Sequence, residues 1–135
     1  MSPHRIVALA AAAVLGVLGG WGLVAVATSG TDAASGVGLP FGVGTGPLLA
    51  TTHLLMALAL VVCAVVSELA ARAAEVAFGV LLLVIGLFGV FAVGSDANVI
   101  AATGSTNLTH MVLSCVLLAS GLGVHVSTPR REPLN

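Results

Sequence analysis

Four uncharged apolar segments, each long enough to cross a lipid bilayer, dominate this chain. They cover residues 6–27, 48–67, 76–94 and 108–126, and none of them contains Asp, Glu, Lys or Arg. A helix needs roughly 20 apolar residues to cross a hydrocarbon core about 30 Å thick. A charge at the centre of a span would cost about 2.5–3.5 kcal/mol. The sequence therefore predicts an all-α integral membrane four-helix bundle, a single transmembrane domain covering residues 1–135.

Composition argues against a soluble protein and against a nucleic-acid-binding one. Hydrophobic residues make up 59% of the chain and charged residues 7%, whereas soluble domains carry roughly 25% charged residues. The formal net charge is −1, and no cluster of basic residues could follow a phosphate backbone. The expected surroundings are a lipid bilayer. The Ala-rich, Lys-free composition favours a bacterial source.

The basic residues predict which side of the membrane each end of the chain occupies. Four spans place the N-terminus, the short polar connection 68–75 and the tail 127–135 on one side, and the Gly-rich loops 28–47 and 95–106 on the other. All the arginines lie on the first side: Arg5, Arg72, Arg130 and Arg131. Because basic residues accumulate on the cytoplasmic side, we predict a cytoplasmic-membrane protein with both termini cytoplasmic.

A cleaved signal peptide is the alternative for the first segment. Ala25-Val26-Ala27 resembles a signal-peptidase site, and Arg5 supplies a charged start. However, the apolar stretch of roughly 20 residues exceeds the roughly 7–15 residues of a signal peptide. The length favours a retained first helix.

The two halves of the chain match each other. Thr52-His53-Leu54 matches Thr109-His110-Met111, and Leu15-Gly16-Val17-Leu18-Gly19 matches Ile85-Gly86-Leu87-Phe88-Gly89. Each half would be a helical hairpin that leaves the cytoplasm and returns. The sequence thus predicts two tandem hairpins forming a parallel pseudo-repeat, related by an axis along the membrane normal.

Small residues are expected where helices pack against each other, because they let backbones approach closely in lipid. Ala8, Ala12, Gly16 and Gly20 recur at intervals of four on the first segment. An Ala- and Gly-rich chain also produces such spacings by chance. Asn107 is expected to cap the fourth helix. The other positions assigned to helix packing are Gly86, Gly89, Ser114 and Gly121.

His53 and His110 are the candidate site residues, since each lies about one turn inside an apolar segment. Helical spacing places both on small or polar faces, so they could converge near the bundle axis. Three interpretations remain open. The imidazoles could bond neighbouring helices and stabilise packing. They could ligate a haem or a metal. Together with Thr52, Thr109 and Ser114, they could line a path for a proton or small solute.

The sequence gives no positive indication of catalysis. It contains no nucleophile with an adjacent base, no phosphate-binding loop and no cluster of metal ligands, and the charges of 68–75 are expected in a solvated turn. We therefore expect a non-enzymatic protein without a resident cofactor or metal. The leading hypothesis is a structural or interaction component that packs with itself or within a larger membrane complex. The alternatives are a haem- or metal-binding redox protein and a small transporter.

The chain resembles a bacterial family catalogued as domain of unknown function 4383. Asn107-Leu108-Thr109-His110, followed by Val112-Leu113, matches the Asn-x-x-His signature that opens the fourth helix of that family, and Leu87-Phe88-Gly89 resembles its third-helix pattern. Thr52-His53-Leu54-Leu55 keeps the histidine at the second helix, but Ala50 stands where the family usually has Asn. The resemblance covers about residues 6–126. It implies a small four-helix membrane protein and carries no established activity.

Overall fold

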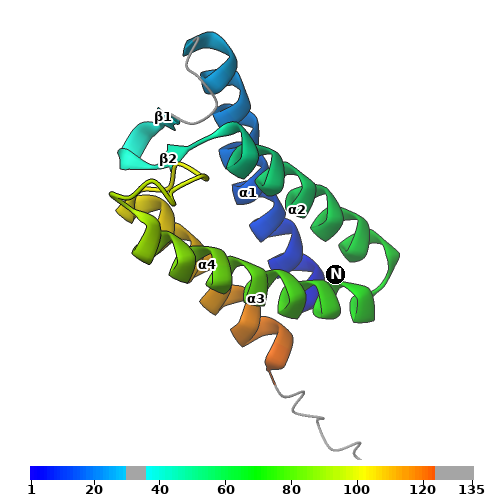
Figure 1. The fold of residues 1–135 in the computed structure, drawn as a ribbon. Coiled ribbons are helices and arrows are strands. Elements are labelled where there is room, and N and C mark those ends of the chain that lie inside the picture. Colours follow the sequence, from blue (N-terminus) through cyan, green and yellow to red (C-terminus); the bar gives the residue numbers. More distant parts are fainter. Residues whose placement is uncertain (30–35, 124–135) are drawn as a thin grey trace, which may run out of the picture.

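The structure is a computed structural model that describes residues 1–29 and 36–123. Its helices are α1 (Pro3–Ser29), α2 (Pro47–Val66), α3 (Glu68–Ala92) and α4 (Gly104–Leu122) (Figure 1). All 4 are long and apolar enough to cross a membrane. The predicted all-α four-helix fold is confirmed. The expected tail 127–135 lies outside the described residues.

The helices pair into two hairpins. α1 packs chiefly along α2, and α3 packs chiefly along α4, while the contacts between the hairpins are fewer. Each helix contributes one leucine with 0% exposure to a shared hydrophobic core cluster: Leu15, Leu60, Leu82 and Leu117. We refer to these residues as the leucine layer. They lie in the cluster that joins the two hairpins, between which helix contacts are fewest.

The connection between α2 and α3 is shorter than expected. Ser67 ends α2 and also caps α3, accepting a hydrogen bond from the backbone N–H of Ala70 at 3.0 Å. The segment 68–75, predicted to be a solvated turn, instead forms the first two turns of α3. The reason is local: Ser67 is a favourable N-cap, and the strong helix formers after it continue the helix without interruption.

The start of α4 also differs from the prediction, because Asn107 is not its cap. The helix begins at Gly104 behind Thr103, whose side chain accepts from the backbone N–H of Thr106, while the side chain of Thr106 accepts from the backbone N–H of Thr103. This reciprocal capping box satisfies backbone donors that a helix start leaves open. Asn107 therefore lies inside the first turns of α4, where it is only 3% exposed.

A small antiparallel ribbon covers the start of α4. It consists of β1 (Val37–Gly38) and β2 (Gly44–Thr45), joined through a short 3-10 turn, η1 (Pro40–Gly42). The backbone N–H of Gly44 donates to Oγ1 of Thr106 at 2.9 Å, and Oγ1 of Thr103 donates to the carbonyl of Gly42 at 2.7 Å. Figure 1 shows this ribbon beside the α3–α4 connection. We call this end of the bundle the loop end.

Arginines stabilise the opposite end, which we call the arginine end. Nε and Nη2 of Arg5 on α1 donate to the carbonyls of Ala64 and Val65, which close α2. Nε of Arg72 on α3 donates to the carbonyl of Gly121 at 2.8 Å, at the end of α4. A cation is favourable at a helix C-terminus, where carbonyl groups lack intrahelical partners. Each hairpin is therefore closed by an arginine from its own first helix.

Candidate functional site

His53 and His110 meet directly in the bundle core. Their Nε2 atoms lie 2.9 Å apart, within hydrogen-bonding distance. The ring centroids are 5.1 Å apart, with the ring planes at 69°. His53 is 2% exposed and His110 is 0% exposed. The expected convergence of the two side chains is therefore present, as a direct contact between the two hairpins.

The spacing of inward-facing residues positions both rings. His53 shares its buried face with Ala57, Leu60 and Ala64, and His110 shares its face with Ser114, Leu117 and Gly121. These residues recur at three- and four-residue intervals, which place them on one side of a helix. The neighbouring threonines do not join the site. Oγ1 of Thr52 donates to the carbonyl of Leu48, and Oγ1 of Thr109 donates to that of Ser105.

The pair leaves two polar atoms unsatisfied. Within the described residues, Nδ1 of both rings is buried without a hydrogen-bond partner. A neutral imidazole has one N–H donor and one acceptor nitrogen. If both rings are neutral, one ring donates from Nε2, and the other ring carries its proton on Nδ1. A buried unsatisfied group costs about 1–3 kcal/mol, whereas interhelical polar bonds in membranes contribute about 0.6 kcal/mol on average. Packing alone therefore explains the pair poorly.

Gly86 and Gly89 allow α4 to approach α3 beside the pair. A Cβ atom at Gly86 would lie 3.2 Å from Cβ of His110. A Cβ atom at Gly89 would lie 1.9 Å from Oδ1 of Asn107, which is closer than real Cβ atoms come to other atoms. Asn107 thus occupies space that only glycine leaves open, one turn before His110. Its function at this position is contact with α3 and not capping of α4.

The small residues predicted on α1 only partly form the packed face. Ala8 and Ala12 are 0% and 4% exposed, but Gly16 is half-buried, and a Cβ atom at Gly20 would have nothing within 4 Å. Positions four residues apart rotate by about 40° at each step of a helix with 3.6 residues per turn. The stripe therefore turns away from α2. The actual close contacts pass through two glycines that the pattern missed, Gly19 and Gly22.

The predicted packing residues on α4 do lie in the helix contact. Oγ of Ser114 donates to the carbonyl of Gly79 at 2.7 Å, and Ser114 is 0% exposed. A Cβ atom at Gly121 would lie 2.7 Å from a methyl carbon of Val76. Both residues therefore hold α4 against α3.

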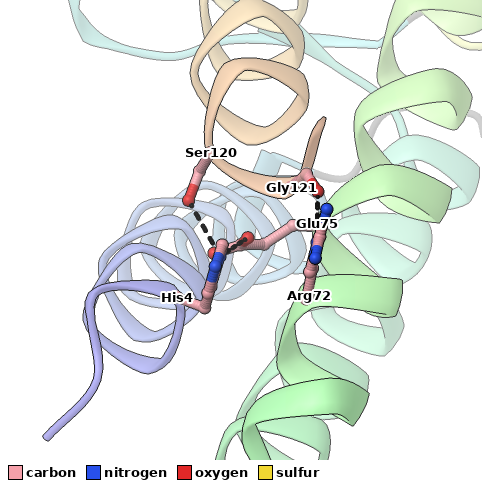
Figure 2. Close-up of polar contacts among 5 residues, drawn as sticks. All are labelled: His4, Arg72, Glu75, Ser120 and Gly121. Atoms are coloured by element: carbon pink, nitrogen blue, oxygen red, sulfur yellow. Dashed lines mark hydrogen bonds and ion pairs between the residues drawn. The ribbon is translucent and has the colours of Figure 1, made fainter. Parts of the chain in front are cut away.

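A second buried polar cluster lies at the arginine end. Nδ1 of His4 on α1 lies 2.9 Å from Oε2 of Glu75 on α3, and Ser120 Oγ on α4 lies 3.5 Å from the same nitrogen. Glu75 is 0% exposed and His4 is 6% exposed. Figure 2 shows these side chains meeting between three helices, beside the bond from Arg72 to Gly121. The cluster links α1 to the α3–α4 hairpin.

Sequence reasoning missed this cluster because it placed Glu75 in a solvated turn. A signal for burial is present in the spacing of the inward face of α3. Its buried residues include Ala71, Glu75, Gly79, Leu82 and Gly86. Extending the Gly86 and Leu82 stripe toward the start of the helix leads directly to Glu75.

The pair geometry disfavours a haem between the two histidines. Two nitrogen ligands on opposite sides of one metal ion lie about 4 Å apart, given metal–nitrogen bonds of about 2.0–2.1 Å. The Nε2 atoms are 2.9 Å apart, so the rings would have to separate to admit an iron. Within the described residues, no group of 3 or more His, Cys, Asp or Glu side chains could hold a metal ion.

No protein-family model matches this chain, and no curated protein or solved structure shows significant similarity to it. The resemblance to the family of domain of unknown function 4383 therefore stays a prediction. The functional argument depends on the geometry of the described residues.

Proposed function

We propose that this chain is a multi-pass protein of the bacterial cytoplasmic membrane with both termini in the cytoplasm. Arg5 and Arg72 lie at the same end of the bundle, where they bind helix C-termini. Among the described residues, the loop end has no Arg or Lys. Two aromatic side chains toward that end, Trp21 and Phe91, are 55% and 84% exposed. The exposed aromatic residues support a membrane boundary near the loop end, and the basic residues at the opposite end support this orientation.

We further propose that the protein is a non-enzymatic structural or interaction component that assembles with a second copy of itself through α1. The observation that carries this proposal is a hollow on the outward face of α1, lined by Gly16, Val17, Gly20, Trp21 and Val24. Gly16 and Gly20 are four residues apart, which is the spacing that lets two membrane helices approach closely. A second α1 presents the same glycines and flanking valines, and is therefore the occupant that we favour.

Replacing Gly20 by Leu tests this interface. Because a Cβ atom at Gly20 has nothing within 4 Å, the larger side chain should leave the monomer intact and fill the hollow. We expect Gly20→Leu to convert a dimer into a monomer in mild detergent, measured by size-exclusion chromatography with light scattering. Ala77→Leu adds similar bulk at an exposed position of α3 and should remain dimeric. A wild-type monomer, or a dimeric Gly20→Leu, would contradict the proposed interface.

We also propose that the two hairpins are equivalent copies of one structural unit. Arg5 binds the carbonyl of Ala64 just as Arg72 binds the carbonyl of Gly121. Likewise, a Cβ atom at Gly19 would approach the backbone oxygen of Ala50, and one at Gly86 would approach that of Asn107. These contacts support a register in which Gly19 corresponds to Gly86. The sequence match pairs Gly19 with Gly89 instead, about one helical turn further along.

A further inference from the structure

The core contains two buried protonatable pairs, one toward each end of the bundle. The His53–His110 pair lies toward the loop end and links the two hairpins through their Nε2 atoms, 2.9 Å apart. The His4–Glu75 pair lies at the arginine end, with Nδ1 and Oε2 also 2.9 Å apart. Ionisable groups inside a membrane bundle commonly mark proton or ion pathways. Two such pairs in one core are therefore candidates for parts of a single pathway.

We propose that the bundle core is a proton pathway, with His53–His110 and His4–Glu75 as its two stations and the leucine layer as a closed gate between them. This activity does not depend on dimerisation through α1. It takes the proton as its only ligand, and it gives a function to the buried Nδ1 atoms of His53 and His110 and to the buried Oε1 atom of Glu75.

The histidine pair has the geometry of a two-ring proton relay. One ring donates its Nε2 proton to Nε2 of the other, and within the described residues both Nδ1 atoms are buried without a partner. The histidine pair therefore has one free acceptor nitrogen and one free donor nitrogen at its two outer positions. Because the groups are chemically identical, transfer of the shared proton is close to thermoneutral once the donating ring has become an imidazolium, which favours rapid exchange.

The transfer step balances in protons and charge. A proton from water binds the unprotonated Nδ1 of the donating ring and makes it an imidazolium. That ring passes its Nε2 proton to Nε2 of the second ring, whose Nδ1 proton then leaves to another water molecule. One proton enters and one leaves, both rings end neutral, and their tautomers are exchanged. Transfer in the opposite direction, or rotation of the rings, restores the first arrangement.

Glu75 is the corresponding acceptor at the arginine end. Its Oε2 atom contacts His4, while Oε1 is buried with no hydrogen-bond partner among the described residues. A carboxylate oxygen in this state can accept a proton that arrives through the core. His4 and Ser120 then extend the chain of polar groups toward the end of α4.

The leucine layer separates the stations in this structure. Leu117 follows His110 by seven residues of α4, and Leu82 follows Glu75 by seven residues of α3, so each interval is about 10 Å at 1.5 Å per residue. A hydrogen bond spans only about 3 Å. Ser114 contributes a hydroxyl group one turn below His110, but the leucines beyond it exclude water. Apolar constrictions of this kind close a pathway by dewetting.

Proton flux into vesicles tests the pathway and the gate together. The full chain is reconstituted into phosphatidylethanolamine–phosphatidylglycerol vesicles that enclose a pH-sensitive dye, and a potassium diffusion potential drives the protons. We expect Leu117→Ser to conduct several-fold faster than protein-free vesicles, because a hydroxyl group in the leucine layer admits water. Cys115→Ser, at an exposed position of α4, is the matched control and should stay at the wild-type level.

The histidine pair is then tested in the open background. Adding His53→Gln to Leu117→Ser retains a hydrogen-bonding side chain but removes the relay, and flux should return to the Cys115→Ser level. If circular dichroism shows that Leu117→Ser does not fold, Leu60→Ala replaces it, since Leu60 occupies the equivalent position on α2. We expect the same increase in flux for Leu60→Ala and the same loss when His53→Gln is added. Flux in the gate variants no faster than in Cys115→Ser would overturn the proposal. So would flux that persists after His53→Gln.

Discussion

Gly89→Ala is expected to destabilise the bundle by about 1–3 kcal/mol, the range typical of an overpacked core. The added Cβ atom would lie 1.9 Å from Oδ1 and 2.7 Å from Cγ of Asn107. Asn107 is 3% exposed, so it cannot move aside without separating α3 from α4. Unfolding by a denaturing detergent in mixed micelles, followed by circular dichroism, measures the loss.

The equivalent position of the other hairpin suggests a rescue. There, Gly22 faces the small side chain of Ala50, although an added Cβ atom would still lie 3.0 Å from it, so combining Gly89→Ala with Asn107→Ala should recover part of the lost stability. Gly104→Ala is the control, since it meets nothing within 4 Å and replaces an exposed glycine at the start of α4. It should be neutral or stabilising by up to about 1 kcal/mol. Equal losses in Gly89→Ala and Gly104→Ala would contradict the close contact.

Glu75→Leu is expected to cost about 1–3 kcal/mol of stability, because it removes the buried polar contact between Glu75 and His4. Glu75 is 0% exposed and pairs with His4 across 2.9 Å. Glu75→Gln keeps an oxygen acceptor for His4 and should cost less. The same detergent-unfolding measurement ranks the two variants.

The pairing itself is tested by the double variant. If the cost comes from the lost contact between these two side chains, adding His4→Leu to Glu75→Leu should recover part of the stability, since apolar residues can replace a buried polar pair. Ala73→Leu, at an exposed position of the same helix, should change stability by no more than about 0.5 kcal/mol. A double variant less stable than Glu75→Leu alone would show that the two residues act independently.

Hydropathy and helical spacing predicted much of the architecture. Charge-free length alone predicted all 4 membrane-length helices. The spacing around His53 and His110 predicted that both rings face inward, because residues three and four apart share a helix face. Direct contact between the rings required in addition that the hairpins place them at the same depth. The matching positions of the two histidines in the sequence suggested a common depth. The distance of 2.9 Å between their Nε2 atoms shows that the two rings do lie at the same depth.

The features that sequence reasoning missed depend on tertiary contact. Glu75 belongs to a polar run that reads as a solvated turn, and its burial requires His4 to arrive from the far end of the sequence. Asn107 is a good cap in isolation, but Thr103 and Thr106 together satisfy the helix start better. A strict four-residue stripe drifts around α1, so Gly20 turns outward while Gly19 and Gly22 make the contacts.

Labelling of single cysteines tests most directly the central claim of four membrane crossings with a cytoplasmic arginine end. Cys63 and Cys115 are first replaced by Ser, and one cysteine is introduced as Pro3→Cys, Glu68→Cys or Ser95→Cys, all at exposed positions. In spheroplasts, a membrane-impermeant maleimide should label Ser95→Cys at once. It should label Pro3→Cys and Glu68→Cys only after the membrane is broken. Labelling of either of these two in intact spheroplasts, or failure of Ser95→Cys to react, would contradict the account.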